Sequence, residues 1–235
     1  MKIEIWSDFT CPYCYIGKRK LEMAIEQFGQ KDDIEIEYKS FELDPEANIL
    51  GEDTKHSMLM KKYGISSEQA IEMTNRISTE GSKIGLHIQF DDVLHTNTFH
   101  AHRLVKYAVQ HGKDHELVER LFERYFIHQQ NIGKRDVLLS LAEEAGLDME
   151  EIDELLCMNR FSKKVRLEEE LAQDLGITGV PFYVFNETYA ISGVQPTELF
   201  LNILHELCQA SNREEKNTTD NSRTTYCTDN KCEIE

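Results

Sequence analysis

The chain has 235 residues, 40% hydrophobic and 29% charged, which is enough to bury a sizeable core. Its formal net charge of −17 argues against binding to nucleic acid or to an anionic membrane, because both need clustered lysine and arginine. No apolar run approaches the roughly 20 residues of a membrane helix, and charges interrupt the first apolar residues, so no export signal is predicted. We therefore expect a cytoplasmic protein, where cysteine pairs are more often catalytic, redox-sensing or metal-binding than structural.

The first 44 residues predict a strand, a helix and a second strand. Residues 2–6 alternate between polar and apolar side chains, and a run with helical apolar spacing then ends at Gly29, a typical helix stop. Residues 34–43 alternate again. This order favours two parallel strands joined by a helix.

Residues 45–164 change to helical periodicity and predict an all-helical insertion domain. Ser66 with Gln69 is typical of a helix N-terminus, as is Asp148 with Glu151. After the insertion we expect a helix carrying Leu167, Leu171 and Leu175, two strands around a turn at 186–187, and a last helix from Pro196. Residues 1–44 and 165–210 would then form one discontinuous domain. Residues 211–235 have almost no aliphatic side chains and predict a mobile tail.

The sequence Cys11-Pro12-Tyr13-Cys14 stands at the expected start of the first helix. A thiol attacks as its thiolate, and the free N–H groups and positive dipole end of a helix N-terminus lower its pKa from about 8.5. Cys11 lies where these groups converge, and Cys14 lies one turn further in. We therefore assign Cys11 as the nucleophile and Cys14 as the resolving thiol, while Pro12 fits the first helical turn.

A second signal is Gly179-Val180-Pro181-Phe182, at the start of a late predicted strand. Proline lacks the N–H that a sheet would use, so it belongs at a strand end or sheet edge. If the bond before Pro181 is cis, the backbone of Val180 can lie beside the cysteines and pair with a peptide or glutathione. A trans proline that merely starts the strand is the alternative.

Together these residues resemble the DsbA-like branch of the thioredoxin superfamily, and most closely the cytosolic FrnE-type oxidoreductases. The family pattern of SDxxCPxC and GVPxFxF…ISGxQ corresponds to residues 7–14 and 179–195, and the likeness extends over about residues 1–210. The segment 95–104 is similar to a further family motif. The resemblance implies an α/β thioredoxin fold interrupted by the helical insertion, with Cys11 as nucleophile and Pro181 as the cis-proline. It implies thiol–disulfide exchange with protein or small-molecule thiols and disulfides.

Two further classes of function stay open. Kappa-class glutathione transferases and 2-hydroxychromene-2-carboxylate isomerases share the architecture, but a serine stands where Cys11 stands here. A zinc site formed by both cysteine pairs is a third reading, since four thiolates suit structural zinc. No cofactor or metal is expected, although glutathione is a candidate substrate. The Pro-Tyr dipeptide is common in glutaredoxin-like sites, so we expect a potential of roughly −200 to −230 mV rather than the −120 mV of periplasmic oxidants.

The remaining candidates surround this pair. The residues expected to contact a substrate are Pro12, Tyr13, Val180, Phe9 and His100. Trp6 joins Phe9 either in an apolar rim or in the core, and Asp8 either assists proton transfer or is a charged loop residue. Cys227 and Cys232 form a candidate second redox pair, or an incidental one, whereas Cys157 and Cys208 are expected in the core. The sequence leaves the substrate, the direction of electron flow and the oligomeric state undetermined.

Overall fold

The computed structural model describes the backbone of residues 1–220 and the side chains of residues 1–210. Its central sheet has the strand order β2-β1-β3-β4. The strands are β1 (Lys2–Ser7), β2 (Glu35–Ser40), β3 (Phe182–Phe185) and β4 (Tyr189–Ser192). β1 pairs with β2 in parallel and with β3 antiparallel, and β3 pairs antiparallel with β4. The predicted parallel pair at the start of the chain is confirmed.

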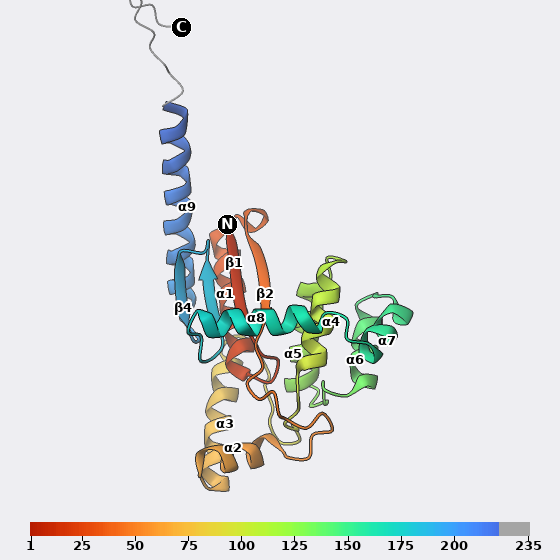
Figure 1. Cartoon of the computed structure of the whole chain (residues 1–235). Helices are drawn as coiled ribbons and strands as arrows, with labels where there is room; N and C mark the ends of the chain where they lie inside the picture. Colours follow the sequence, from red (N-terminus) through yellow and green to blue (C-terminus); the bar gives the residue numbers. More distant parts are fainter. Residues whose placement is uncertain (221–235) are drawn as a thin grey trace, which may run out of the picture.

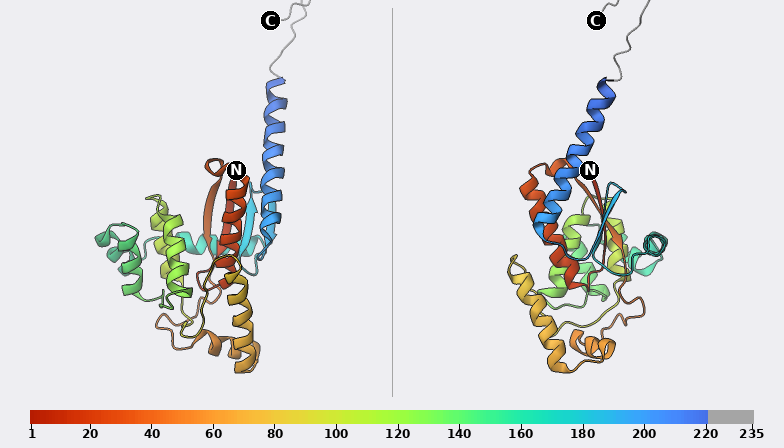
Figure 2. Two further views of the ribbon diagram at one scale, coloured as in Figure 1. Left: turned by 180° about the vertical axis from the view of Figure 1, so that it is seen from behind. Right: turned by 90° about the vertical axis from the view of Figure 1, so that its left-hand side faces the viewer.

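Helices cover both faces of this sheet. α1 (Pro12–Phe28) joins the two parallel strands and ends at Gly29, whose positive φ of 77° allows its N–H to bond to the Ile25 carbonyl. α1 packs beside α9 (Thr197–Asp220) on one face, and α8 (Ser162–Asp174) crosses the other (Figures 1 and 2). The sheet is thus the middle layer, and α1 runs from the end of its central strand.

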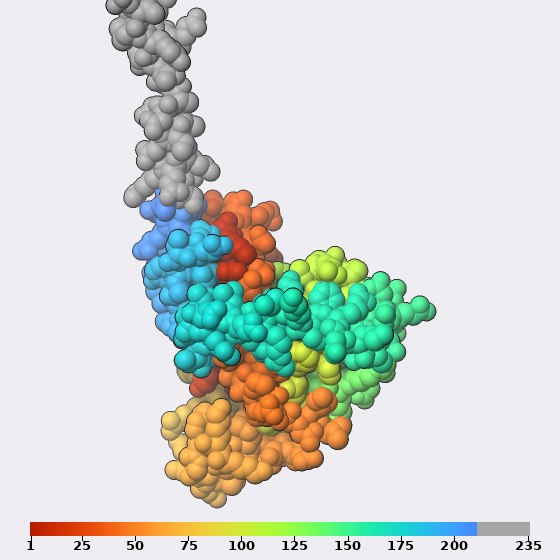
Figure 3. Space-filling view, viewed as in Figure 1, coloured from red at the N-terminus to blue at the C-terminus, as the bar shows by residue number. Residues whose placement is uncertain are grey.

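The segment between β2 and α8 is helical, as predicted. A short 3-10 turn (Lys31–Asp33) precedes β2. The helices that follow it are α2 (Lys55–Tyr63), α3 (Ser67–Ser82), α4 (Phe99–Val109), α5 (Asp114–Phe126), α6 (Arg135–Glu144) and α7 (Met149–Cys157). The capping box of Ser66 and Gln69 is formed, and the Asp148 carboxylate caps α7. In the space-filling view α2 and α3 form a lobe beneath α8 (Figure 3). Within the described part of the chain, no helix is long and apolar enough to cross a membrane.

One continuous apolar core joins the sheet to the helical segment. Ile3 of β1, Leu104 of α4 and Phe122 of α5 are all fully buried members of the same cluster. The Tyr15 ring of α1 stacks on the Phe122 ring, with their centroids 4.9 Å apart. The helical segment therefore packs directly on α1, whose N-terminus holds the two cysteines.

The apolar stripe expected on α8 faces away from the core. Leu167, Leu171 and Leu175 are 50%, 41% and 54% exposed, whereas Glu168 and Ala172 are buried against the sheet. The helix turns this way because Glu168 has buried partners on the sheet side. A buried charge with partners, rather than the spacing of leucines, sets the orientation of this helix.

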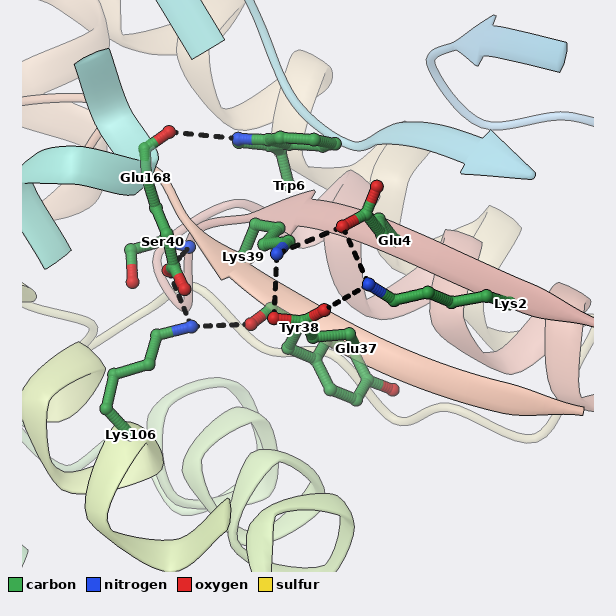
Figure 4. Close-up of polar contacts among 9 residues, drawn as sticks. All are labelled: Lys2, Glu4, Trp6, Glu37, Tyr38, Lys39, Ser40, Lys106 and Glu168. Carbon is green, nitrogen blue, oxygen red and sulfur yellow. Dashed lines mark hydrogen bonds and ion pairs between the residues drawn. The ribbon is translucent and has the colours of Figure 1, made fainter. Parts of the chain in front are cut away.

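Those partners tie α4 and α8 to the edge of β2 (Figure 4). The Glu168 carboxylate accepts hydrogen bonds from the Ser40 N–H at 2.8 Å and from the Lys106 ammonium group at 2.6 Å. Lys106 also donates to the Tyr38 carbonyl at 2.6 Å, and the Trp6 indole donates to the Glu168 carbonyl at 3.2 Å. The sheet face beside Trp6 carries further ion pairs within and between β1 and β2, formed by Lys2, Glu4, Glu37 and Lys39.

The end of the chain differs from the expectation in one respect. α9 continues to Asp220 (Figure 1), so residues 211–220 of the expected tail are helical in backbone. The tail was expected from the lack of aliphatic side chains, but a helix that already packs on α1 can continue past its last packed turn. Cys227 and Cys232 lie outside the described residues.

Candidate active site

Cys11 occupies the position immediately before α1. It is the N-cap residue, with extended backbone angles (φ −92°, ψ 111°), and Pro12 follows in the first helical position. The Cys11 side chain forms no capping hydrogen bond, and the Cys14 N–H bonds to the Cys11 carbonyl at 3.1 Å. The Cys11 sulfur thus lies at the positive end of the helix dipole, and the Cys14 backbone N–H is among the groups that lower its pKa.

The two cysteines and the loop before β3 meet at this helix end. Cys11 and Cys14 are free thiols, 4% and 2% exposed. The Val180–Pro181 peptide bond is cis, as the sequence had led us to expect. The Cys11 sulfur lies 3.5 Å from the Val180 carbonyl oxygen. Residues far apart in the chain thus form one site, with Cys11 nearest to the proline loop.

The two thiols have opposite acidities. The Cys14 thiol donates a hydrogen bond to Cys11, which lowers the pKa of Cys11 against the opposing effect of burial. The pKa of Cys14 is raised, first by its own burial and then by its hydrogen bond to Cys11 and the charge there. One sulfur is therefore prepared to carry negative charge while the other keeps its proton.

A buried acid and a buried lysine lie beneath the pair. Asp8 is 1% exposed, and its carboxylate accepts the N–H groups of Thr10 at 3.0 Å and Leu43 at 2.7 Å. Lys55, at the start of α2, is 6% exposed and donates to the Thr10 carbonyl at 3.1 Å. Burial raises the pKa of Asp8 and lowers the pKa of Lys55. The charge of Lys55 favours the Cys11 thiolate and that of Asp8 opposes it.

Of the residues expected to contact a substrate, Tyr13 lies at the surface and Phe9 does not. Tyr13 is 44% exposed on the first turn of α1, and the Cys11 charge is among the causes that raise the pKa of its phenol. Phe9 is 2% exposed and packs against His102 and Phe122. Of the two positions considered for Phe9, an apolar rim or the core, the structure shows the core, since the helical segment covers its ring. Trp6 is likewise buried.

His100 also lies apart from the dithiol. Its ring nitrogen contacts the Arg103 guanidinium at 2.9 Å, and the ring lies against Phe99. None of its described contacts reaches either thiol, so His100 is left out of the proposed site. His102 is the histidine turned toward the centre of the protein, and burial lowers its pKa to about 3. A neutral, buried ring beside Phe9 is a packing residue.

A tyrosine of β3 lies behind the pair. Tyr183 is fully buried, and a Cβ placed on Gly17 of α1 would lie only 2.1 Å from the Tyr183 hydroxyl oxygen. The same Cβ would lie 3.3 Å from Pro181 Cγ. Gly17 therefore lets the proline loop and β3 approach the second turn of α1.

The other cysteines give a mixed outcome. Cys157 is exposed, with its sulfur 3.8 Å from the Arg135 guanidinium, so its predicted place in the core is wrong. It falls at the end of α7, past the buried side of that helix. Cys208 is partly buried and contacts Gln30 at 3.6 Å. Across the residues that the structure describes, no cluster of three or more His, Cys, Asp or Glu could hold a metal.

Sequence reasoning missed two charged residues near the site. Lys55 follows the N-cap Thr54, a position that gives no sign of burial. Glu42 has a buried side chain that accepts from Asn97 at 2.9 Å and pairs with Arg166 at 2.5 Å. Burial raises the pKa of Glu42 to about 7. The signal that could have found Glu42 is its position just after a parallel strand, beside the end of β1.

The fold and this site define a thioredoxin-fold protein of the thiol–disulfide oxidoreductase class. Residues 2–205 match the model of the DSBA-like thioredoxin domain, and the chain belongs to that family. The YwbO protein of Bacillus subtilis is 31% identical over 200 residues, covering 84% of this chain and 92% of YwbO.

Solved structures agree with this assignment. A probable DsbA oxidoreductase from Streptomyces coelicolor is 32% identical, covers 100% of this chain and 99% of its own, and superposes with a TM-score of 0.83. The cytosolic disulfide reductase DsbM from Pseudomonas aeruginosa, at 13% identity, covers 89% of this chain and all of its own with a TM-score of 0.60, and shares the fold.

Proposed function

We propose that the protein exchanges disulfides through Cys11 and Cys14, with Cys11 as nucleophile and Cys14 as resolving thiol. The observation that carries the proposal is the opposite acidity of the two thiols beside the cis-proline loop. The Cys11 thiolate attacks a substrate disulfide, forms a mixed disulfide and releases one substrate thiolate. Cys14 then attacks the Cys11 sulfur, which releases the second substrate thiol and leaves the Cys11–Cys14 disulfide. The substrate gains the two electrons that the pair loses, and the reverse sequence oxidises a dithiol.

The surroundings support a role for each neighbouring group. Tyr13 and Pro12 border the pair on the solvent side, and the Val180 carbonyl is within reach of a chain bound at Cys11. The charge of Lys55 favours the attacking thiolate. We further propose that Asp8, whose pKa is raised by burial, assists proton transfer during the exchange. We take protein or small-molecule disulfides as substrates and the cytoplasm as the compartment. The fold shared with DsbM, which has been solved with GSH, supports glutathione as one candidate.

The test is to trap the intermediate. In Cys14→Ala, Cys11 should accumulate mixed disulfides that mass spectrometry detects and that a reductant releases, and insulin reduction should cease. Cys157→Ala is the matched control, because it removes an exposed thiol and should change neither result. If Cys14→Ala traps nothing while the protein acts on glutathione-conjugated aromatic compounds, the glutathione transferase or isomerase class is the better assignment.

The proposal extends to a second pair, Cys227 and Cys232, which lies outside the described residues. Its support is the sequence alone: two close cysteines follow the last helix at the end of the chain. The double variant Cys227→Ala, Cys232→Ala should slow re-reduction of the Cys11–Cys14 disulfide by added thiols and leave the first attack by Cys11 unchanged. Unchanged re-reduction would make the second pair incidental. If the wild type carries zinc and the double variant does not, the second pair belongs to a metal site instead.

A further inference from the structure

Tyr183 has a hydroxyl group that the packing of the protein does not require. The side chain is fully buried, and its oxygen has no hydrogen-bond partner among the residues that the structure describes. A buried donor without a partner destabilises the folded state, and phenylalanine would fill the same space without that penalty. The hydroxyl group of Tyr183 is therefore expected to have a role other than packing.

The hydroxyl lies on the same face of α1 as Cys14. It touches the position of Gly17, which follows Cys14 by three residues, and residues three apart share a helix face. Burial and the negative charges of Cys14 and Cys11, in that order, raise the pKa of Tyr183. The phenol therefore keeps its proton while a thiolate forms nearby, and toward a thiolate, which has no hydrogen to give, it can act only as a donor.

Cys14 needs such a donor at one step of the cycle. In the dithiol its thiol donates to Cys11 and receives bonds from the Ser7 side chain and the Asp8 N–H. In the mixed disulfide Cys11 no longer carries a charge, and Cys14 itself must become the thiolate in a fully buried place. Its sulfur must also move, because the disulfide brings the two sulfur atoms to about 2.05 Å.

We propose that the Tyr183 hydroxyl donates a hydrogen bond to the Cys14 thiolate during the resolving step. The inference rests on the proposed function. In that step the Cys14–H proton leaves, the Cys14 sulfur bonds to the Cys11 sulfur, and the bond from Cys11 to the substrate sulfur breaks. The proton ends on the released substrate thiol, and the phenol keeps its own proton throughout. Tyr183 thus stabilises the negative charge on the Cys14 sulfur and does not transfer a proton.

A chromogenic aromatic disulfide separates the two attacks. Mixed with the reduced protein in a stopped-flow instrument, it releases one coloured thiolate when Cys11 attacks and a second when Cys14 resolves the mixed disulfide. Tyr183→Phe should leave the first phase unchanged. It should slow the second about tenfold near neutral pH and move its pH midpoint up by about one unit, the change expected for loss of one hydrogen bond to a charged group.

Tyr107→Phe is the matched control. Tyr107 is also buried, but it packs against His111 and Phe161, away from the pair. The inference fails if Tyr183→Phe gives a normal second phase with an unchanged midpoint, or if Tyr107→Phe slows that phase equally. Absence of both phases in the wild type would instead refute the proposed function, so the two failures are distinct.

Discussion

A single methyl group added to Gly17 should collide with the Tyr183 hydroxyl. The Cβ of Gly17→Ala would lie 2.1 Å from that oxygen, whereas ordinary contacts begin at 3.4 Å. Either the phenol or the helix must therefore move by about 1 Å in a closely packed interior. Gly17 is buried in the second turn of α1, so neither side has free space.

The magnitude follows from two opposing effects. Overpacking of this kind costs about 1–3 kcal/mol, and alanine in place of a mid-helix glycine returns about 1 kcal/mol. Gly17→Ala should therefore destabilise the protein by about 0–2 kcal/mol. In Tyr183→Phe the colliding atom is absent, and the nearest atoms to the new methyl become Pro181 Cγ at 3.3 Å and ring carbon Cζ at 3.4 Å. There the same substitution should be neutral or stabilising by up to about 1 kcal/mol.

Denaturant unfolding of the wild type, Gly17→Ala, Tyr183→Phe and the double variant measures the coupling free energy between the Gly17 position and the Tyr183 hydroxyl. We expect this coupling to be about 2 kcal/mol. The midpoint should change while the slope with denaturant stays constant. Gly81→Ala in α3 is the control, because its close neighbours are Ile88 and Leu86, and its effect should be equal in both backgrounds. An equal penalty for Gly17→Ala with and without the Tyr183 hydroxyl would refute the packing described here.

Further predictions concern the buried charges. Lys55→Gln removes a positive charge that favours the Cys11 thiolate, so the pKa of Cys11 should rise. The pH profile of Cys11 alkylation by iodoacetamide should then move to higher pH. An unchanged profile would exclude the electrostatic role of Lys55. Lys106→Met leaves Glu168 buried without its cation and should cost about 3–5 kcal/mol in denaturant unfolding, and adding Glu168→Leu should recover much of it; an additive double variant would contradict this. Burial raises the pKa of Glu42 from 4.5 to about 7, so the native state holds this proton more tightly than the unfolded state. Its contribution is therefore full below pH 4.5 and is lost as the pH rises through 7. Glu42→Gln should flatten that fall of about 3 kcal/mol, measured by unfolding at both ends of the range. A redox titration of the Cys11 pair should give about −200 to −230 mV, and a value near −120 mV would contradict the expectation from its Pro-Tyr dipeptide.

Local signals in the sequence sufficed for the parts of the site that depend on the backbone. The start of α1 at Pro12 follows from proline chemistry, and its end follows from Gly29. The parallel order of β1 and β2 follows from the helix between them. The cis bond before Pro181 was expected from a two-motif resemblance, and the structure has it. The first three of these features are decided by residues close together in the chain, whereas the cis bond was expected from the resemblance of two distant motifs to one family.

Features that depend on partners from distant segments could not be predicted. The exposed leucines of α8 have the spacing of a buried stripe, yet Glu168 faces the sheet because Lys106 and the Ser40 N–H meet it there. Phe9 has the position of a rim residue, but α5 brings Phe122 against its ring. Periodicity ranks residues by polarity, and it cannot show which polar residue has a buried partner.

The buried lysines connect the helical segment to the candidate site and to the sheet. The chain has a net charge of −17, yet Lys55 and Lys106 are buried. Lys55 of α2 donates to the Thr10 carbonyl, and Lys106 of α4 donates to the Tyr38 carbonyl of β2. Each holds a helix of the segment in register with the strands. Lys55 does so at the residue before Cys11, where its charge also favours the thiolate. The same buried amine therefore links α2 to the loop before Cys11 and adds to the effects that lower the pKa of Cys11, of which the hydrogen bond from Cys14 is the largest.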